Sequence, residues 1–176
     1  MLVYKENYFH ISKSDFFELG KNYEFGLSYN PFFQYFWDFG YGDTLEWDEI
    51  KQLVSDYQLY VRECIFESVR VKHFPDLPSR KKCIWLISPE NKDSAIKYWA
   101  PLVNSTGAPC TVIEMECTGK IFIADSLLLP HMFGHFQKQK EQAFKYWSGE
   151  NAPQSFPAAQ EILFVGTATV VRIEKI

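Results

Sequence analysis

The stretch Glu161-Ile-Leu-Phe-Val-Gly-Thr-Ala-Thr-Val-Val-Arg-Ile173 decides the fold class of this chain. It is rich in β-branched and other apolar residues, which suit a pleated, half-buried surface. Gly166 lies in its middle, where a glycine is typical of a bulge or a sharp bend. The stretch therefore predicts a closing pair of strands, 161–164 and 169–173, or one bent strand.

A second strand-rich segment precedes this one. Residues 110–117 alternate with the period of a strand, and Gly119 separates them from another predicted strand at 120–124. Strands therefore gather in the last third of the chain and do not alternate strictly with helices. This arrangement favours an α+β fold with a split, mostly antiparallel β-sheet and flanking helices over a doubly wound parallel sheet.

The remaining segments are predicted from their periodicity and their turn residues. Residues 46–73 show the strongest helical pattern, because an apolar stripe that includes Val54, Tyr57 and Val69 has helical spacing. The other predicted elements are a strand at 2–11, a short helix at 15–19 capped by Ser12 or Ser14 and ended by Gly20, an ordered loop at 21–43, a central strand at 82–88, helices at 89–103 and 137–147, and a polar loop at 149–157.

Length and composition restrict the class of protein. The chain has 176 residues, 47% of them hydrophobic, and fits one domain, 1–176. No apolar run reaches the length of a membrane span and the first residues do not resemble a signal peptide, so a cytoplasmic location is expected. The net charge of -4 argues against binding along a nucleic-acid backbone. The 4 cysteines are scattered, which favours reduced, buried thiols over disulfides or a zinc site.

Most familiar catalytic and metal-binding motifs are absent from the sequence. It has no glycine-rich dinucleotide or phosphate loop, no Gly-x-Ser-x-Gly elbow and no His-Glu-x-x-His helix. His131 and His135 have the spacing of metal ligands on a helix, but no cysteine or carboxylate accompanies them at ligand spacing, so no metal site is predicted. Cys64 with His73 is a weak nucleophile and base pair, because Cys64 falls on the apolar stripe.

Three short segments form a sharper pattern. They are Tyr8-Phe-His-Ile-Ser12 on the first predicted strand, Ile84-Trp-Leu-Ile-Ser88 with the following Asp93-Ser-Ala-Ile-Lys-Tyr98, and Gln160-Glu-Ile-Leu-Phe164 at the start of a late strand. In this order they resemble the ADP-ribosyltransferase superfamily, and within it the diphtheria-toxin and poly(ADP-ribose) polymerase branch with its His-Tyr-Glu triad. The whole chain looks like a minimal, bacterial version of that fold.

The resemblance implies roles for the matching residues, with NAD as the substrate. His10 would hydrogen-bond the adenosine-side ribose, the backbone at Ile11 would hold the nicotinamide amide, and Ser12 would support that contact. Tyr98 would stack on the nicotinamide ring, and Ser94 would lie near its amide.

Glu161 is the catalytic carboxylate that the resemblance implies. Cleavage of the nicotinamide–ribose bond develops positive charge on the sugar, so a fixed carboxylate stabilises the transition state more than the substrate. Trp85 stands where the polymerase branch has its first tyrosine on the second motif strand, and is expected to contact NAD. Arg80 belongs to a basic stretch that could meet the pyrophosphate of a dinucleotide.

The expected activity is therefore ADP-ribosyl transfer or NAD hydrolysis. The acceptor would be a protein side chain, a nucleic-acid base or water, and the acidic net charge favours protein over nucleic acid. Ile11, which replaces the family's usual glycine, and Trp85 leave open a non-catalytic module that binds a nucleotide or a protein. A third reading is a 2′-phosphotransferase of the same fold, with Arg62, Arg70 and Arg80 as candidate phosphate ligands.

Overall fold

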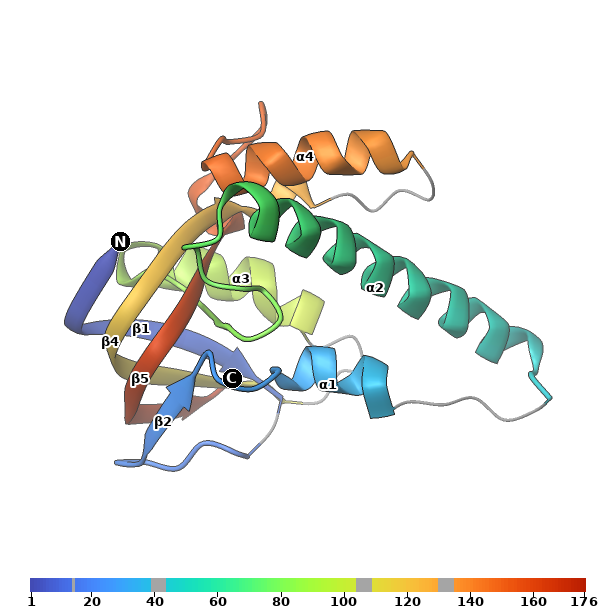
Figure 1. Cartoon of the computed structure of the whole chain (residues 1–176). Helices are drawn as coiled ribbons and strands as arrows, with labels where there is room; N and C mark the ends of the chain where they lie inside the picture. Colours follow the sequence, from blue (N-terminus) through green and yellow to red (C-terminus); the bar gives the residue numbers. More distant parts are fainter. Residues whose placement is uncertain (14, 39–43, 104–108, 130–134) are drawn as a thin grey trace.

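The protein is an antiparallel β-sheet with helices packed on its outside (Figure 1). The structure is a computed structural model and describes residues 1–13, 15–38, 44–103, 109–129 and 135–176. Its elements are β1 (Leu2–Ser12), β2 (Asn22–Phe25), α1 (Pro31–Asp38), α2 (Trp47–His73), β3 (Ile84–Leu86), η1 (Pro89–Asn91), α3 (Lys92–Val103), β4 (Thr111–Asp125), η2 (Ser126–Leu128), α4 (Phe136–Ser148), η3 (Pro157–Ala159) and β5 (Gln160–Lys175). The α+β class with an antiparallel sheet, as predicted, is confirmed.

The sheet curls back on itself. Its strand order is β1-β4-β5-β2, and β3 pairs with β5 on the same side as β2. The end of β3 then meets β1, because Phe9 and Ile87 exchange two backbone hydrogen bonds of 3.1 and 2.7 Å. The strands β1, β4, β5 and β3 therefore form a closed sheet that encloses a core.

β4 and β5 are each one long strand, and they pair along most of their length. The predicted break between 110–117 and 120–124 is therefore wrong, and the single bent strand is the correct alternative for 161–173. Gly119 lies directly opposite Gly166 in the pair. A Cβ atom built on Gly119 would lie 2.3 Å from the carbonyl oxygen of Val165, so this glycine permits a close approach of two backbones and does not interrupt its strand.

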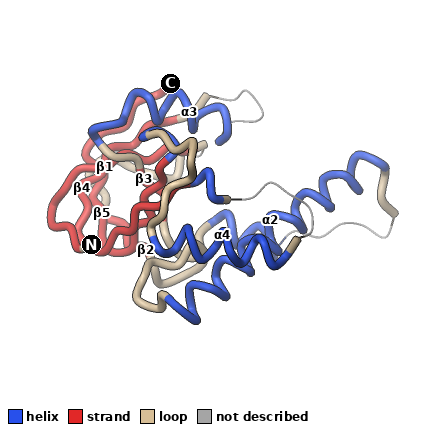
Figure 2. The backbone as a smooth tube through the Cα atoms, turned by 90° about the horizontal axis from the view of Figure 1, so that it is seen from above, coloured by secondary structure: helices blue, strands red, loops and turns tan. Residues whose placement is uncertain are grey.

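Three clusters of buried apolar side chains hold the elements together. One lies inside the curled sheet and contains Tyr8, Met115 and Phe164. The second lies between the sheet and the helices α2 and α4, and contains Phe66, Trp147 and Leu163. The third lies between β1 and α3, and contains Phe9, Ile11 and Ala95. Figure 2 shows the same layers, with α3 on one side of the strands and α2 with α4 on the other.

Helix α2 agrees with its predicted bounds, but its buried face does not agree with the predicted stripe. The helix begins with a capping box in which the Glu46 backbone N–H donates to the Glu49 carboxylate at 2.8 Å. Val54 and Tyr57 are exposed, because the first half of α2 projects beyond the sheet (Figures 1 and 2). The buried positions are Asp56, Arg62, Glu63, Phe66 and Val69. Charged side chains thus occupy much of the face that α2 buries, and apart from Val69 this face lies away from the predicted apolar stripe.

Two predictions near the start of the chain are wrong. Residues 15–19 form turns and no helix, because the Tyr23 hydroxyl accepts a hydrogen bond from the Glu18 N–H and donates one to the Phe16 carbonyl. These tertiary contacts satisfy backbone groups that a helix would otherwise pair. Ser12 is the last residue of β1, which excludes a capping role, and Ser14 lies outside the described residues.

The segment 21–43 was predicted to be a loop, but its described part contains β2 and α1. Asn30 is the missed signal, because its side chain is buried and accepts a hydrogen bond from the Phe33 N–H at 3.1 Å. This is the N-cap contact that starts a helix. Residues 39–43 of the same predicted loop lie outside the described residues.

Among the helices that the structure describes, none combines the length and the apolarity needed to cross a bilayer.

Candidate functional site

The strand parts of the three sequence motifs, far apart in the chain, lie on neighbouring strands. β3 pairs with the start of β5, with Trp85 opposite Leu163 and Leu86 opposite Ile162. β1 meets the end of β3 through Phe9 and Ile87. The His10, Trp85 and Glu161 segments are therefore joined by backbone hydrogen bonds at one place in the sheet.

Glu161 is buried at this place and is held by two partners. Its carboxylate forms an ion pair with Arg80 and accepts a hydrogen bond of 2.5 Å from the Tyr146 hydroxyl on α4. Arg80 also donates to the Tyr146 oxygen at 2.7 Å. Burial raises the pKa of Tyr146 well above its usual value. The positive charge of Arg80 opposes this rise and the negative charge of Glu161 adds to it, so the phenol stays protonated and donates its hydrogen bond.

A second carboxylate completes the network on the α2 side. Glu63 accepts hydrogen bonds from Arg80 Nε at 2.7 Å and from Arg62 Nη2 at 2.8 Å. Burial would raise the pKa of Glu63, but the two guanidinium charges outweigh it and lower the pKa. Burial would likewise lower the pKa of Arg80, but the charges of Glu161 and Glu63 raise it well above the usual value. The network is thus electrically neutral, with two cations facing two anions.

Trp85 lies against the same network and has an unsatisfied donor. The Arg80 guanidinium lies 5.7 Å from the centre of the Trp85 ring, and Phe32 of α1 packs edge-on against that ring at 5.9 Å. The indole N–H of Trp85 is buried and has no acceptor in the part of the chain that the structure describes. A buried donor without an acceptor costs free energy, so a ligand that offers an oxygen here would satisfy it.

His10 lies on the inner face of β1. Its Nδ1 donates to the Trp85 carbonyl at 2.9 Å, so this nitrogen carries the proton, and its ring meets Phe17 at 5.4 Å. Burial lowers the pKa of His10 to about 4, and the hydrogen bond to Trp85 offsets only part of that effect. The imidazole is therefore neutral at neutral pH. The Ile11 side chain points the other way, into the cluster under α3, and leaves this face free of its bulk.

Tyr98 and Ser94 lie elsewhere. The Tyr98 ring on α3 packs against Phe156 at 5.3 Å and against its neighbour Trp99, while the exposed Ser94 hydroxyl donates to the Asn91 carbonyl. Within the described residues, no hydrogen bond, ion pair or ring contact joins Tyr98 to His10 or Glu161. The structure thus joins the side chains of Trp85, Arg80 and Glu161 on the outer face of the sheet, whereas His10 reaches only the Trp85 backbone carbonyl, from the inner face. Tyr98 and Ser94 lie on the far side of β1. Ser12 is buried at the end of β1, opposite Thr111.

Residues 8–176 match the model of the family described as "Protein of unknown function (DUF2441)". The chain belongs to this family. The matched span contains every member of the buried network, together with His10 and Trp85. A search of curated proteins found no match to the chain.

Two members of the network were missed from the sequence. Glu63 and Tyr146 contact the predicted residue Arg80, but each looked like an ordinary position of an amphipathic helix. No sequence signal marked Glu63, because it lies away from the predicted apolar stripe and only the structure shows that its face of α2 is the buried one.

The arginines considered as phosphate ligands are all paired with carboxylates. Arg62 and Arg80 bind Glu63, and Arg70 binds Glu67 at 2.8 Å and two backbone carbonyls. None of these three arginines has an uncompensated charge for a phosphate, so they do not support a 2′-phosphotransferase. In the described part of the chain no three His, Cys, Asp or Glu side chains are grouped as metal ligands, and His131 lies outside that part.

Acidification is expected to destabilise the protein through His10. The unfolded chain binds this proton with a pKa near 6.5 and the folded chain only near 4, so the stabilising effect is complete above the first value and is lost as the pH falls towards the second. Between pH 7 and pH 5 the free energy of unfolding should drop by about 2 kcal/mol from this group. Urea unfolding at both pH values measures the drop. In His10→Gln, which cannot take up the proton, this part should be missing; an equal drop in both proteins would contradict the assignment.

Proposed function

We propose that this protein is an NAD-consuming enzyme that cleaves the nicotinamide–ribose bond and transfers ADP-ribose to an acceptor or to water. The observation that carries the proposal is the adjacency of the three motifs: β1, β3 and β5, which come from the beginning, the middle and the end of the chain, are joined by backbone pairing. In the ADP-ribosyltransferases that the sequence resembles, the corresponding three segments form the NAD site. A chance likeness of three short segments would not require them to be neighbours.

The side chains at this place support a division of labour. Glu161 supplies a fixed negative charge against the positive charge that develops on the ribose. Arg80 and Tyr146 hold that carboxylate in one orientation. His10 is neutral and donates through Nδ1 to the Trp85 carbonyl, so it holds the β3 backbone beside the site from the inner face of the sheet.

Trp85 supports the binding of a nicotinamide group better than Tyr98 does. Its ring lies beside Arg80, the partner of Glu161, whereas the Tyr98 ring is occupied by Phe156. The buried indole N–H also needs an acceptor, and the carboxamide oxygen of nicotinamide is one. We therefore assign the stacking position to Trp85 and keep Tyr98 as part of the α3 packing.

One observation favours a second candidate, a non-catalytic module that binds a nucleotide or a protein on the same fold. The Glu161 charge is already neutralised by Arg80, and both side chains are buried. A carboxylate in a neutral, buried network is less able to stabilise a new positive charge than an unpaired one. Binding without turnover would follow.

The test is release of nicotinamide from NAD by the purified protein, with and without a cell extract as the source of acceptor. Glu161→Gln should reduce turnover at least about a hundredfold, because it removes the charge that acts in the transition state and keeps the size of the side chain. Glu174→Gln is the matched control, since Glu174 lies exposed near the end of the same strand. It should leave turnover unchanged.

Thermal unfolding with NAD separates the two candidates. An enzyme consumes NAD, whereas a binding module shows only a rise in melting temperature. Turnover that is equal in wild type and Glu161→Gln, at comparable melting temperature, would refute the role of Glu161. A clear thermal shift without turnover would favour the binding module. The absence of both turnover and a thermal shift would refute both candidates.

A further inference from the structure

A groove separate from the Glu161 network lies at the C-terminal end of α2. It has a volume of about 390 Å³, within the range of small-ligand sites. Its apolar walls come from Phe25 and Leu27 after β2, from Leu77 in the connector that follows α2, and from Val165 on β5. The groove therefore offers an apolar surface on which a ring or a short aliphatic group can rest.

Two lysines on this groove have no carboxylate partner. Lys82 Nζ donates to the Leu27 carbonyl at 3.1 Å, and Lys120 Nζ donates to the Asp76 carbonyl at 2.9 Å. Within the described ranges, no Asp or Glu lies within ion-pairing distance of either ammonium group. Each ammonium has three N–H donors, so each keeps donors for a ligand.

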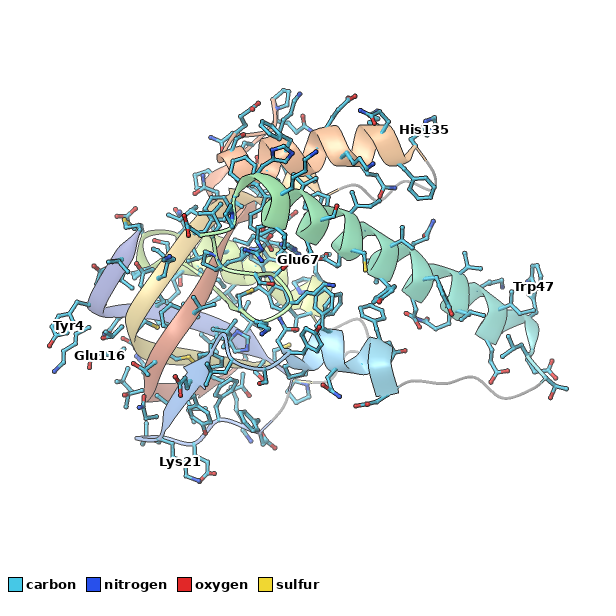
Figure 3. The ribbon with its side chains drawn as sticks, viewed as in Figure 1. Tyr4, Lys21, Trp47, Glu67, Glu116 and His135 are labelled. Atoms are coloured by element: carbon cyan, nitrogen blue, oxygen red, sulfur yellow. The ribbon has the colours of Figure 1, made fainter. Side chains whose placement is uncertain are left out.

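The remaining charges of the groove do not cancel these two. Arg70 is neutralised by Glu67, which Figure 3 labels on α2, at 2.8 Å. Asp76 carries one exposed carboxylate at the edge of the groove. With Lys82, Lys120 and Asp76 counted together, the groove keeps a positive charge in a chain whose net charge is -4.

We propose that this groove binds a small organic phosphate, with the phosphate on Lys82 and Lys120 and its organic group on the apolar walls. A phosphate monoester carries roughly -1.5 to -2 charges at neutral pH and offers three acceptor oxygens, which suits two ammonium groups better than a carboxylate does. The site is independent of NAD cleavage. Val165 follows Glu161 by four positions on β5, roughly 13 Å along an extended strand.

The experiment is isothermal titration calorimetry of the full chain with two probes, inorganic phosphate and phenyl phosphate. Phenyl phosphate should bind about tenfold more tightly, because its ring buries apolar surface that inorganic phosphate lacks. Lys82→Ala and Lys120→Ala should each weaken the binding of both probes about tenfold. Lys140→Ala, an exposed lysine on α4, should change neither affinity.

A further variant isolates the apolar part. Leu27→Ser changes an exposed side chain, 71% accessible, and should weaken only phenyl phosphate. Equal affinities of the two probes would overturn the proposal. So would affinities that do not respond to Lys82→Ala and Lys120→Ala in proteins that keep the wild-type melting temperature. Because neither probe contains NAD, a failure here is distinguishable from a failure of the proposed activity.

Discussion

Replacing Arg80 by methionine is expected to destabilise the folded protein by about 3–5 kcal/mol, because it leaves buried carboxylates without their counter-charge. Arg80 bridges Glu63 and Glu161, and the side chains of all three are at most 7% exposed. Methionine fills much of the same volume, so lost packing contributes little. Urea unfolding of wild type and variant measures the difference.

Two controls identify the cause of this loss. Arg80→Met with Glu161→Gln should recover part of the stability, since the second change removes one stranded charge and Arg62 still pairs with Glu63. Arg172→Met should cost less than about 0.5 kcal/mol, because that side chain is 64% exposed and its contact with Glu174 is long, at 3.6 Å. If the double variant were no more stable than Arg80→Met, packing and not charge would explain the loss.

Replacing Gly119 by alanine is expected to destabilise the protein by about 3 kcal/mol or more, the upper range for steric overpacking. The new Cβ would lie 2.3 Å from the Val165 carbonyl oxygen and 2.9 Å from the Cα of Gly166. Both are backbone atoms of β5, so relief requires the two longest strands to separate. Chemical denaturation measures the loss.

Gly20→Ala is the matched control for this substitution. Gly20 has φ +76 and no heavy atom within 4 Å of a built Cβ, so alanine there meets only the backbone penalty of a left-handed residue, about 1 kcal/mol. A loss at Gly119 as small as that at Gly20 would show that the strands move apart easily and that the close crossing contributes little to stability.

Much of the secondary structure could be predicted because it depends on local pattern. The bounds of α2 and α4 follow from helical spacing, and the strands at each end of the chain follow from alternation and β-branched residues. The errors at 15–19 and 21–43 have a different cause. There, Tyr23 and Asn30 satisfy backbone groups through side-chain contacts, which a periodic pattern does not reveal.

The candidate site was only partly predictable. Glu161, His10 and Trp85 were proposed from their motifs and Arg80 from a basic stretch. The structure brings the Trp85, Arg80 and Glu161 side chains together, whereas His10 contacts only the Trp85 backbone. Tyr98 was placed by the same motifs but lies in a separate cluster under α3. Neither Glu63 nor Tyr146 belongs to a motif, because each acts on the site from a helix that packs against the sheet.

The sequence by itself determined the fold class, the long helix and the order of the three motifs, since each of these depends on residues close together in the chain. Only the tertiary structure decided that Arg80 would meet Glu161, 81 positions away, and Glu63, 17 positions away. It also decided that Gly119 would face Gly166. The physical reason is that a buried charge needs a counter-charge and two closely packed strands need residues without a Cβ. Which residues are buried together depends on which distant segments the fold brings into contact.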